Sequence, residues 1–272
     1  MDETHIPGRI KSFVIRAGRM TEAQREGLEL GWPDYGLDPD AGLLDLDLAF
    51  GFQGSTVLEI GFGMGQSLVQ QASEHPEHRF IGVEVHRPGV GKLLHDARDQ
   101  HVTNIRVYCH DAVEVLERCI PLQTLDRVQI FFPDPWHKKK HHKRRLVQPE
   151  FLSLLSTRMC PGAILHLATD WEHYARHMLQ VLTQHPDSDN TVADYAPRPD
   201  SRPLTKFERR GEQMGHAQPD QWRCNDGHNN EDNLDKVEKE AENEHDQHRD
   251  DQGTCHISGY GEQKVLNHLV AH

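Results

Sequence analysis

Five short apolar runs follow one another along the chain, and helical patterns separate them. The runs occupy residues 55–62, 79–85, 104–110, 126–132 and 163–170. Between the first two, Leu68, Val69 and Ala72 share one helical face, and Pro76 ends the pattern. Strands that alternate with helices form βαβ units, in which neighbouring strands run parallel. We therefore predict an α/β fold with a mostly parallel sheet and helices on both of its faces.

The two ends of the chain differ from this central region. Residues 8–20 carry four basic residues and no acidic one, which suits an arm that contacts phosphate, although an ordinary solvated segment has the same composition. Residues 217–272 hold 13 acidic and 5 basic residues, a composition typical of disorder. We expect a flexible basic arm at 1–30, a folded domain at 31–216 and an acidic, disordered tail at 217–272. The net charge of −13 therefore does not exclude a nucleic-acid partner.

Composition also limits the class of protein. No apolar run approaches the roughly 20 residues that cross a membrane, and the N-terminus lacks the apolar segment of a secretory signal, so we expect a cytoplasmic protein. The five cysteines are widely spaced without a C-x-x-C pair, which indicates free thiols. The histidines of the tail are scattered, and we expect no metal.

The segment VLEIGFGMGQS places three glycines between the first strand and the helix that follows. Gly61, Gly63 and Gly65 have the spacing G-x-G-x-G, which differs from the dinucleotide fingerprint G-x-G-x-x-G. Glycines let the backbone turn tightly and approach a ligand, and the first turn of the helix offers unpaired N–H groups. A purely structural tight turn would use the same glycines, so the triplet alone does not identify a ligand.

Acidic residues fall near the ends of four successive strands, where open α/β sheets bind their ligands. Glu84 lies about 20 residues beyond the glycines, where a carboxylate accepts ribose hydroxyls. Asp111 is placed to meet an adenine, Glu59 directly precedes the glycines, and Asp134 follows the fourth strand. So many acids would repel a cofactor with two phosphates and attract a nucleoside with a positive sulfonium. The set therefore favours S-adenosylmethionine over NAD.

The fourth strand ends in FPDPWHKKKHHKRR, where one carboxylate stands between two prolines. Pro133 fixes its own φ and Pro135 keeps Asp134 out of the helical region, so the carboxylate has little backbone freedom. Trp136 offers a flat surface on which a base can stack. A solvated charged loop would also be rich in basic residues, but beside a cofactor site we expect a strip that binds an RNA backbone. Its residues are Lys138, Lys139, Lys140, His141, His142, Lys143, Arg144 and Arg145.

Four segments resemble the motifs of the bacterial tRNA (guanine-N7-)-methyltransferase family: LEIGFGMGQSL, FPDPWHKKKHHKRRL, LATDWEHYA and TKFERRGEQMGH. The likeness covers residues 9–216. It implies a class I S-adenosylmethionine-dependent methyltransferase (Rossmann-like) fold and methyl transfer to guanine 46 in the variable loop of tRNA. The family usually closes its sheet with a short, partly hydrophobic segment after the last motif, whereas this chain continues into the acidic tail.

The resemblance also implies roles for individual residues. Asp134 is expected to be catalytic, and the cofactor is expected to be S-adenosyl-L-methionine. The expected cofactor-side residues are Glu59, Gly61, Gly63, Gly65, Glu84, Asp111 and Asp134. The expected tRNA contacts are Lys138, Asp170, Thr205, Lys206, Phe207 and Glu208, together with the basic strip.

The chemistry of guanine defines what Asp134 has to do. Guanine N7 carries a free lone pair at neutral pH, so methyl transfer needs no base to activate the nucleophile. We therefore expect Asp134 to orient the guanine and to stabilise the positive charge that enters the purine ring. Two other functions stay open here: a non-catalytic RNA-binding protein on a methyltransferase fold, and a nicotinamide oxidoreductase, whose glycine spacing the chain lacks. We expect a monomer.

Overall fold

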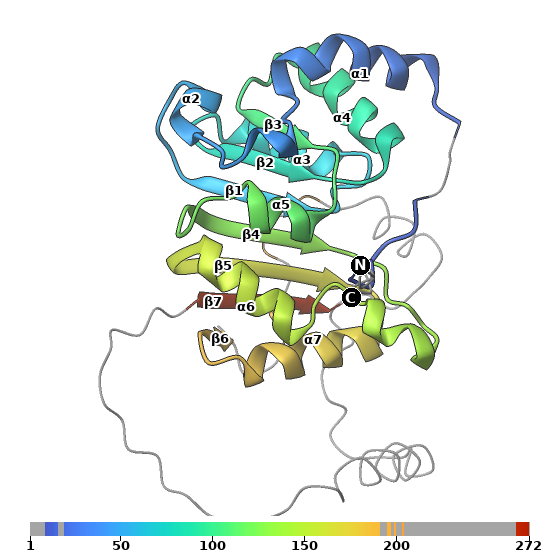
Figure 1. The fold of residues 1–272 in the computed structure, drawn as a ribbon, viewed down its shortest axis with the longest axis vertical. Coiled ribbons are helices and arrows are strands. Elements are labelled where there is room, and N and C mark those ends of the chain that lie inside the picture. The colour runs from blue at the N-terminus through green and yellow to red at the C-terminus, as the bar shows by residue number, and fades with distance from the viewer. Residues whose placement is uncertain are drawn as a thin grey trace, which may run out of the picture. The chain divides into compact units, whose positions relative to one another are not determined.

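Seven parallel strands form one sheet in the computed structural model, which describes residues 9–15, 19–190, 195–196, 199, 203 and 265–271 (Figure 1). The order is β3-β2-β1-β4-β5-β7-β6, and every neighbouring pair is parallel. The five strands predicted from the sequence, β1 to β5, are confirmed. The strand bounds are β1 Thr56–Ile60, β2 Arg79–Val83, β3 Ile105–Tyr108, β4 Leu125–Phe131, β5 Met159–Thr169, β6 Ser188–Asn190 and β7 Val265–Ala271.

The chain reverses its direction across the sheet between β3 and β4. From β1 it moves outward to β2 and β3, and it then returns to the other side of β1 to form β4 and β5. Open parallel sheets bind ligands at the carboxyl ends of their strands, beside such a reversal. The place to look for a site is therefore the edge where Ile60 and Phe131 end β1 and β4.

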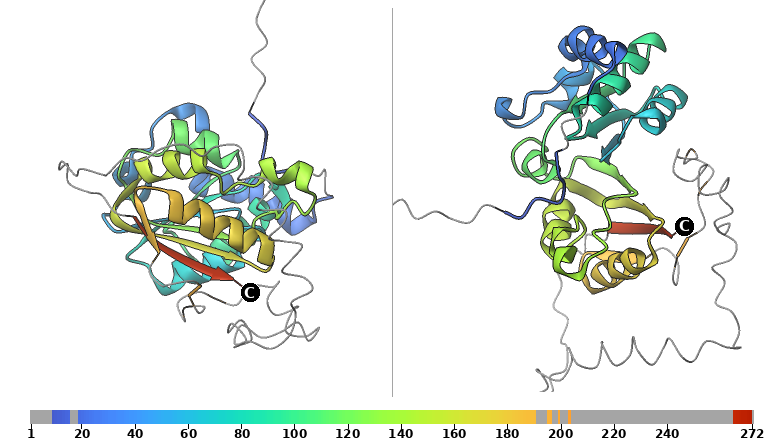
Figure 2. Two further views of the ribbon diagram at one scale, coloured as in Figure 1. Left: turned by 90° about the horizontal axis from the view of Figure 1, so that it is seen from below. Right: turned by 90° about the vertical axis from the view of Figure 1, so that its right-hand side faces the viewer.

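Helices cover both faces of this sheet (Figure 2). α1, α3 and α4 pack in one buried cluster that includes Val57 and Phe80, and α5, α6 and α7 pack in a second that includes Leu58 and Ile81. Successive residues of a strand point to opposite faces, so the two clusters lie on opposite sides of the sheet. The helices are α1 Glu22–Tyr35, α2 Leu46–Phe50, α3 Gln66–Glu74, α4 Arg87–Asp99, α5 Ala112–Arg118, α6 Pro149–Arg158 and α7 Glu172–Gln184, with 3-10 helices η1 Pro39–Ala41 and η2 Lys139–Arg144.

Both ends of the chain contribute to the fold beyond the predicted domain boundaries. A boundary at residue 30 falls within α1, which packs so closely on α4 that a Cβ at Gly27 would lie 2.1 Å from the carbonyl oxygen of Gly91. β7 belongs in sequence to the predicted acidic tail, yet it pairs with β5 and β6. The sheet therefore has a closing strand, and residues 217–264 of the tail lie outside the described residues. Among the described residues, no helix has the length and apolar character that a membrane crossing requires.

Candidate active site

A turn of three left-handed glycines joins β1 to α3. Gly61, Gly63 and Gly65 have φ values of 76°, 59° and 76°, a region that L side chains rarely adopt. A Cβ at Gly61 or Gly63 would meet nothing within 4 Å, whereas a Cβ at Gly65 would lie 2.5 Å from the Cβ of Leu93. The first two glycines therefore border open space that can take a ligand. The third allows α4 to pack against this glycine loop.

The Glu84 carboxylate connects the end of β2 to the glycine loop. Its Oε2 accepts a hydrogen bond from the Gly63 N–H at 2.9 Å. Its Oε1 accepts hydrogen bonds from the N–H groups of Val85 at 2.7 Å and His86 at 2.9 Å. These bonds hold the carboxylate beside the loop, where the sequence predicts a contact with a ribose.

Asp111 and Glu59 are the two buried acids of the predicted cofactor site. Asp111 is 4% exposed, and its Oδ1 accepts a hydrogen bond from the Val113 N–H at 3.0 Å, which caps α5. Its Oδ2 accepts a hydrogen bond from the guanidinium group of Arg9. Glu59 is 3% exposed and lies in β1 beside Gln129 of β4. The fold thus brings these acids to the same edge of the sheet as the glycine loop.

The basic arm crosses from the start of α5 to the loop that follows β4. At one end, Arg9 contacts the acid that caps α5. At the other end, the carbonyl oxygen of Ser12 accepts a hydrogen bond from Nε1 of Trp136 at 3.0 Å, and that of Phe13 accepts one from Nη2 of Arg144 at 3.1 Å. The arm therefore touches both the predicted adenine-binding acid and the basic strip.

Two residues with strained backbone flank Asp134. Phe132 has a φ of 52° and Trp136 a φ of 49°, although both side chains are bulky. Such a conformation costs about 1–3 kcal/mol per residue and tends to occur at functional sites. The Phe132 N–H donates to the carbonyl oxygen of Ala168 in β5 at 2.8 Å, which anchors the start of the loop. The Asp134 side chain is exposed within this loop and is available to a substrate.

Arg145, a predicted RNA contact, faces the interior. It is 2% exposed, its Nε donates to the carbonyl oxygen of Pro135 at 2.9 Å, and its guanidinium group lies 4.8 Å from the centre of the Tyr174 ring. Its Nη2 lies 3.2 Å from Nδ1 of His173. Burial lowers the pKa of Arg145 from its ordinary value. The prediction for this residue is corrected, because so buried a side chain supports the Asp134 loop and cannot reach a phosphate.

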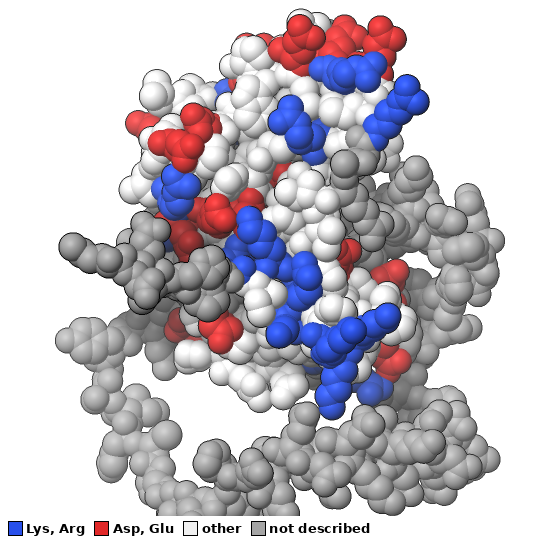
Figure 3. All heavy atoms as spheres, turned by 45° about the vertical axis from the view of Figure 1, so that its right-hand side comes forward, with Lys and Arg blue, Asp and Glu red and all other residues white. Residues whose placement is uncertain are grey.

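The lysines of the basic strip are exposed. Lys138, Lys140 and Lys143 lie at the surface in or beside η2. Arg144 is half-buried, and its guanidinium group lies 4.2 Å from the centre of the Trp136 ring. Figure 3 shows Lys and Arg side chains gathered in a band on the face that comes forward from the right of Figure 1. This surface has the charge that a phosphate backbone requires.

The two histidines of the basic strip are less exposed than its lysines. Both are half-buried, and the His141 ring centre lies 5.8 Å from that of Trp136. Burial, and then the nearby charge of Arg145, lower the pKa of His142. The His142 imidazole is therefore mostly neutral at pH 7 and is a weak partner for a phosphate.

Asp170 lies just beyond the end of β5, next to the loop of Asp134. Its side chain is exposed, and that of Trp171 is 41% exposed. The ring of Trp171 meets that of His137 edge to face, with 4.3 Å between centres. This contact joins the segments that follow β4 and β5. The other predicted tRNA contacts lie outside the described residues, namely Thr205, Lys206, Phe207 and Glu208.

A buried polar chain that the sequence analysis missed supports the glycine loop from below. Nε2 of Gln129 donates to Oε1 of Gln71 at 2.8 Å, and Nε2 of Gln71 donates to Oγ of Ser67 at 3.1 Å. The two glutamines are 2% and 4% exposed. This series of side-chain hydrogen bonds connects the first turn of α3 to the sheet position beside Glu59. A signal was present, because one glutamine interrupts the apolar run VQIFF.

Comparisons with known proteins place these features in a family. Residues 53–220 match a family model described as "Putative methyltransferase". The tRNA (guanine-N(7)-)-methyltransferase of Chromohalobacter salexigens is 56% identical over 219 residues, which cover 78% of this chain and 89% of that protein. The protein of the same name from Ectopseudomonas mendocina is 56% identical over 210 residues, which cover 76% and 88%.

A solved structure is more distant. The 30S ribosomal A1408 methyltransferase from an uncultured bacterium is 17% identical with a TM-score of 0.38, over 51% of this chain and 64% of that chain. The sequence relatives are decisive, because their identity exceeds half and extends over nearly their whole length. This chain belongs to the tRNA (guanine-N7-)-methyltransferase family.

Proposed function

We propose that this chain transfers the methyl group of S-adenosyl-L-methionine to N7 of guanine 46 in the variable loop of tRNA. The observation that carries the proposal is the exposed Asp134, held on a strained loop that starts beside the glycine loop and continues into the basic strip. The names of relatives that are 56% identical support the choice of substrate and of guanine N7.

The residues at the carboxyl edge of the sheet fit this cofactor. Gly61 and Gly63 border space that a Cβ would fill, and the acids around them suit a positive sulfonium. Glu84 would hold the ribose hydroxyls, and Asp111 would meet the adenine at the end of β3. The bound cofactor supplies an electrophilic methyl group. Glu59 contributes a buried carboxyl group from below, inside β1.

Asp134 acts on the guanine. With the cofactor bound, the N7 lone pair would form the new C–N bond while the C–S bond would break, and the electron pair of the C–S bond would stay on sulfur. The purine becomes positively charged in this step, and a fixed carboxylate stabilises that charge more than it stabilises the neutral base. The carboxylate can also accept a hydrogen bond from the N–H edge of the guanine, which aligns N7 with the methyl group. No metal ion is needed for this step.

The basic strip holds the RNA. Lys138, Lys140 and Lys143 are exposed and can each approach a phosphate. Trp171 is 41% exposed and offers a flat surface for a base, and stacking on such a ring is worth about 1–3 kcal/mol. Each phosphate contact adds about −0.7 to −0.9 to the slope of log affinity against log salt. The affinity for tRNA should therefore fall steeply as salt rises.

Transfer of labelled methyl to unmodified tRNA tests the proposal. Wild type is compared with Asp134→Ala and Asp134→Asn, and with Asp99→Ala as a control for an exposed carboxylate on α4. We expect label at the variable-loop guanine, an about 100- to 1,000-fold slower rate in both Asp134 variants, and an unchanged rate in Asp99→Ala. Because Asp134 is exposed, its variants should unfold at the wild-type denaturant concentration.

The outcomes separate the possible functions. Full activity in Asp134→Asn would contradict the electrostatic role, because the amide keeps the shape and loses the charge. Label at another nucleotide would overturn the choice of substrate. Binding of tRNA without any transfer would favour the non-catalytic RNA-binding alternative.

We also infer that the protein acts as a monomer in the cytoplasm. The glycine loop, the acids and the basic strip all come from one chain, so the site needs no second copy. Light scattering after gel filtration should give a mass near 31.2 kDa. A dimer mass at micromolar protein would contradict the inference.

A further inference from the structure

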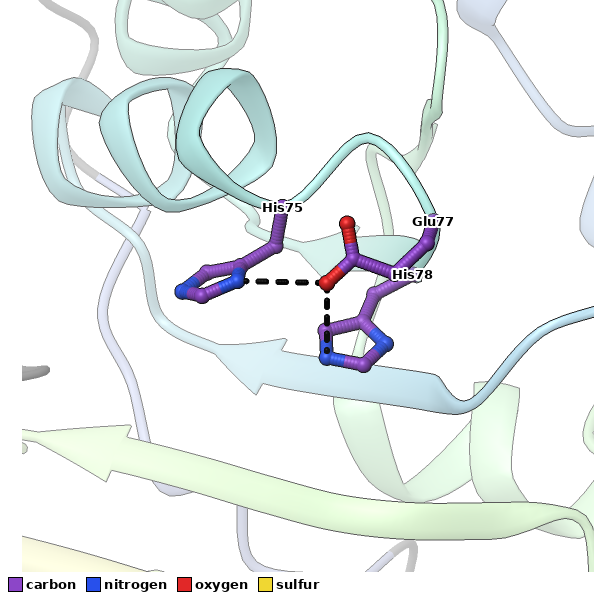
Figure 4. A group of neighbouring side chains, drawn as sticks. All are labelled: His75, Glu77 and His78. Carbon is purple, nitrogen blue, oxygen red and sulfur yellow. Dashed lines mark hydrogen bonds and ion pairs between the residues drawn. The ribbon is translucent and has the colours of Figure 1, made fainter.

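A second polar cluster lies at the edge of the sheet opposite to the proposed active site. His75 ends α3, Glu77 lies in the following turn, and His78 directly precedes β2 (Figure 4). The active-site groups follow the carboxyl ends of the strands, whereas this turn enters β2 at its amino end. A five-residue strand separates the two edges by about 16 Å. The cluster is therefore remote from methyl transfer.

The three side chains converge on one oxygen atom. Nδ1 of His75 lies 3.3 Å, and Nε2 of His78 lies 3.6 Å, from Oε1 of Glu77. Figure 4 shows the carboxylate between the two rings, and all three ligand atoms lie within 4.8 Å of one another. Ligands of a tetrahedral zinc ion stand about 3.4 Å apart. The two distances from the imidazole nitrogens to Oε1 of Glu77 are already close to this value. Rotation of the rings has to shorten the third distance, between the two imidazole nitrogens, by at most about 1.4 Å.

The turn that carries these side chains is held in place from inside the protein. Nδ2 of Asn104, a residue that is 4% exposed, lies 3.0, 3.0 and 2.9 Å from the carbonyl oxygens of Ala72, His75 and His78. Pro76 further restricts the backbone of the turn. Less conformational entropy is therefore lost when the side chains close around an ion.

Charge and access also suit a cation. The Glu77 carboxylate lies beside both imidazoles, so the group offers two nitrogen ligands and one oxygen ligand to an ion. The side chains are 45%, 61% and 34% exposed in chain order, so an ion can enter from solvent and keep water at its remaining positions.

We propose that His75, Glu77 and His78 bind one divalent transition-metal ion of the zinc class. Two imidazoles and one carboxylate suit Zn²⁺, Co²⁺ or Ni²⁺ better than Mg²⁺ or Ca²⁺, which prefer oxygen ligands. The ion ties the end of α3 to the start of β2 and stabilises the turn. This revises the expectation from the sequence that no metal binds. Within the described part of the chain, no other group of three such side chains has this spacing.

Cobalt is the probe for the test, because a Co²⁺ ion with imidazole ligands has a visible absorption spectrum. Untagged full-length protein, freed of metal by a chelator, is titrated with Co²⁺ at pH 7.5. The variants are His75→Ala, His78→Ala and Glu77→Gln. The matched control is His110→Ala, which removes an imidazole whose Nε2 lies 2.7 Å from Oε2 of Glu114. That pair lacks a third ligand within the described residues.

The wild type and His110→Ala should bind one more equivalent of Co²⁺ than the two histidine variants do. Glu77→Gln should weaken that equivalent at least tenfold. Zn²⁺ should raise the midpoint of thermal unfolding of the wild type and leave that of His78→Ala unchanged. Equal stoichiometry and affinity in the wild type and in both histidine variants would overturn the proposal, with circular dichroism used to verify that each variant is folded. Histidines elsewhere in the chain bind the same amount of Co²⁺ in every variant, so they do not affect the difference between variants. Methyl transfer is not measured, so neither outcome affects the proposed function.

Discussion

Three glycines share one backbone conformation but have different surroundings. Alanine substitutions at these positions can therefore show which glycine of the loop is required for packing and which for ligand binding. Gly51, Gly61 and Gly65 have φ values of 75°, 76° and 76°. A Cβ would meet nothing within 4 Å at Gly51 or Gly61, whereas at Gly65 it would lie 2.5, 2.6 and 2.8 Å from the Cβ, Cδ1 and Cγ atoms of Leu93. Gly51 ends α2 and lies outside the glycine loop. An alanine at each of these positions would therefore have the same φ but different neighbouring atoms.

The magnitudes follow from this geometry. An alanine in the left-handed region costs about 1–2 kcal/mol, and the loss of glycine's freedom in the unfolded chain returns about 0.4–1 kcal/mol. Gly51→Ala and Gly61→Ala should each lower the free energy of unfolding by about 1 kcal/mol. Leu93 is fully buried and its Cβ is fixed to α4, so Gly65→Ala adds about 1–3 kcal/mol of overpacking. For a chain of this size the additional 1–3 kcal/mol corresponds to a melting temperature about 2–12 °C lower.

Urea unfolding measures these values, and calorimetric titration with S-adenosyl-L-methionine measures binding. Gly61→Ala should weaken the cofactor at least tenfold with little loss of stability, because its methyl group enters the space assigned to the ligand. Gly51→Ala should leave binding unchanged. Equal destabilisation by Gly65→Ala and Gly51→Ala would refute the packing argument, and unchanged binding in Gly61→Ala would refute the assignment of the open space.

Three further predictions concern the arm and the support of the Asp134 loop. Arg9→Ala should strengthen cofactor binding up to about fivefold in calorimetry, because the partly exposed ion pair of Arg9 with the α5 cap is worth at most about 1 kcal/mol; weaker binding would contradict this competition. Arg145→Gln, which removes the positive charge, should lower the turnover number and leave the salt dependence of tRNA affinity unchanged; a shallower salt slope would instead show that Arg145 contacts a phosphate. Burial is the main cause that lowers the pKa values of His173 and His177, so the unfolded chain binds more protons than the folded protein between those lowered values and pH 6.5. Urea unfolding should therefore show stability falling as pH drops below about 6.5, and His177→Gln should reduce that fall.

The sequence predicts the centre of the sheet well because β1 and β2 are buried on both faces. Most residues of β1 and β2 are apolar. Short apolar runs bounded by polar turns therefore identify these strands without knowledge of their neighbours. β7 was missed for the opposite reason. The segment VLNHLVA is apolar, but it follows a long acidic segment, and composition averaged over 217–272 hides it. Its place between β5 and β6 depends on pairing partners far away in sequence, which no local pattern reveals.

Some parts of the candidate site could likewise be predicted from the sequence, and others could not. The acids at the strand ends are predictable, because the topology alone carries them to one edge. The cluster of His75, Glu77 and His78 was not predictable, since His75 and His78 stand three residues apart in a turn whose shape depends on hydrogen bonds from Asn104, the residue that precedes β3. The strain at Phe132 was also hidden, because a residue before a proline is expected in an extended conformation.

Arg144 and Arg145 show most clearly why residue type alone could not assign the basic strip. The two are adjacent and carry the same charge, yet Arg145 turns inward where η2 ends, with φ −56° and ψ 138°. A buried guanidinium group can donate in its plane to Pro135 while its face lies on Tyr174, whereas a lysine ammonium group is a compact, strongly hydrated charge that is costly to bury. The lysines of the strip are therefore restricted to the surface, where phosphate contacts are made. An arginine in the same run can serve either purpose, and only the backbone turn after η2 decides which.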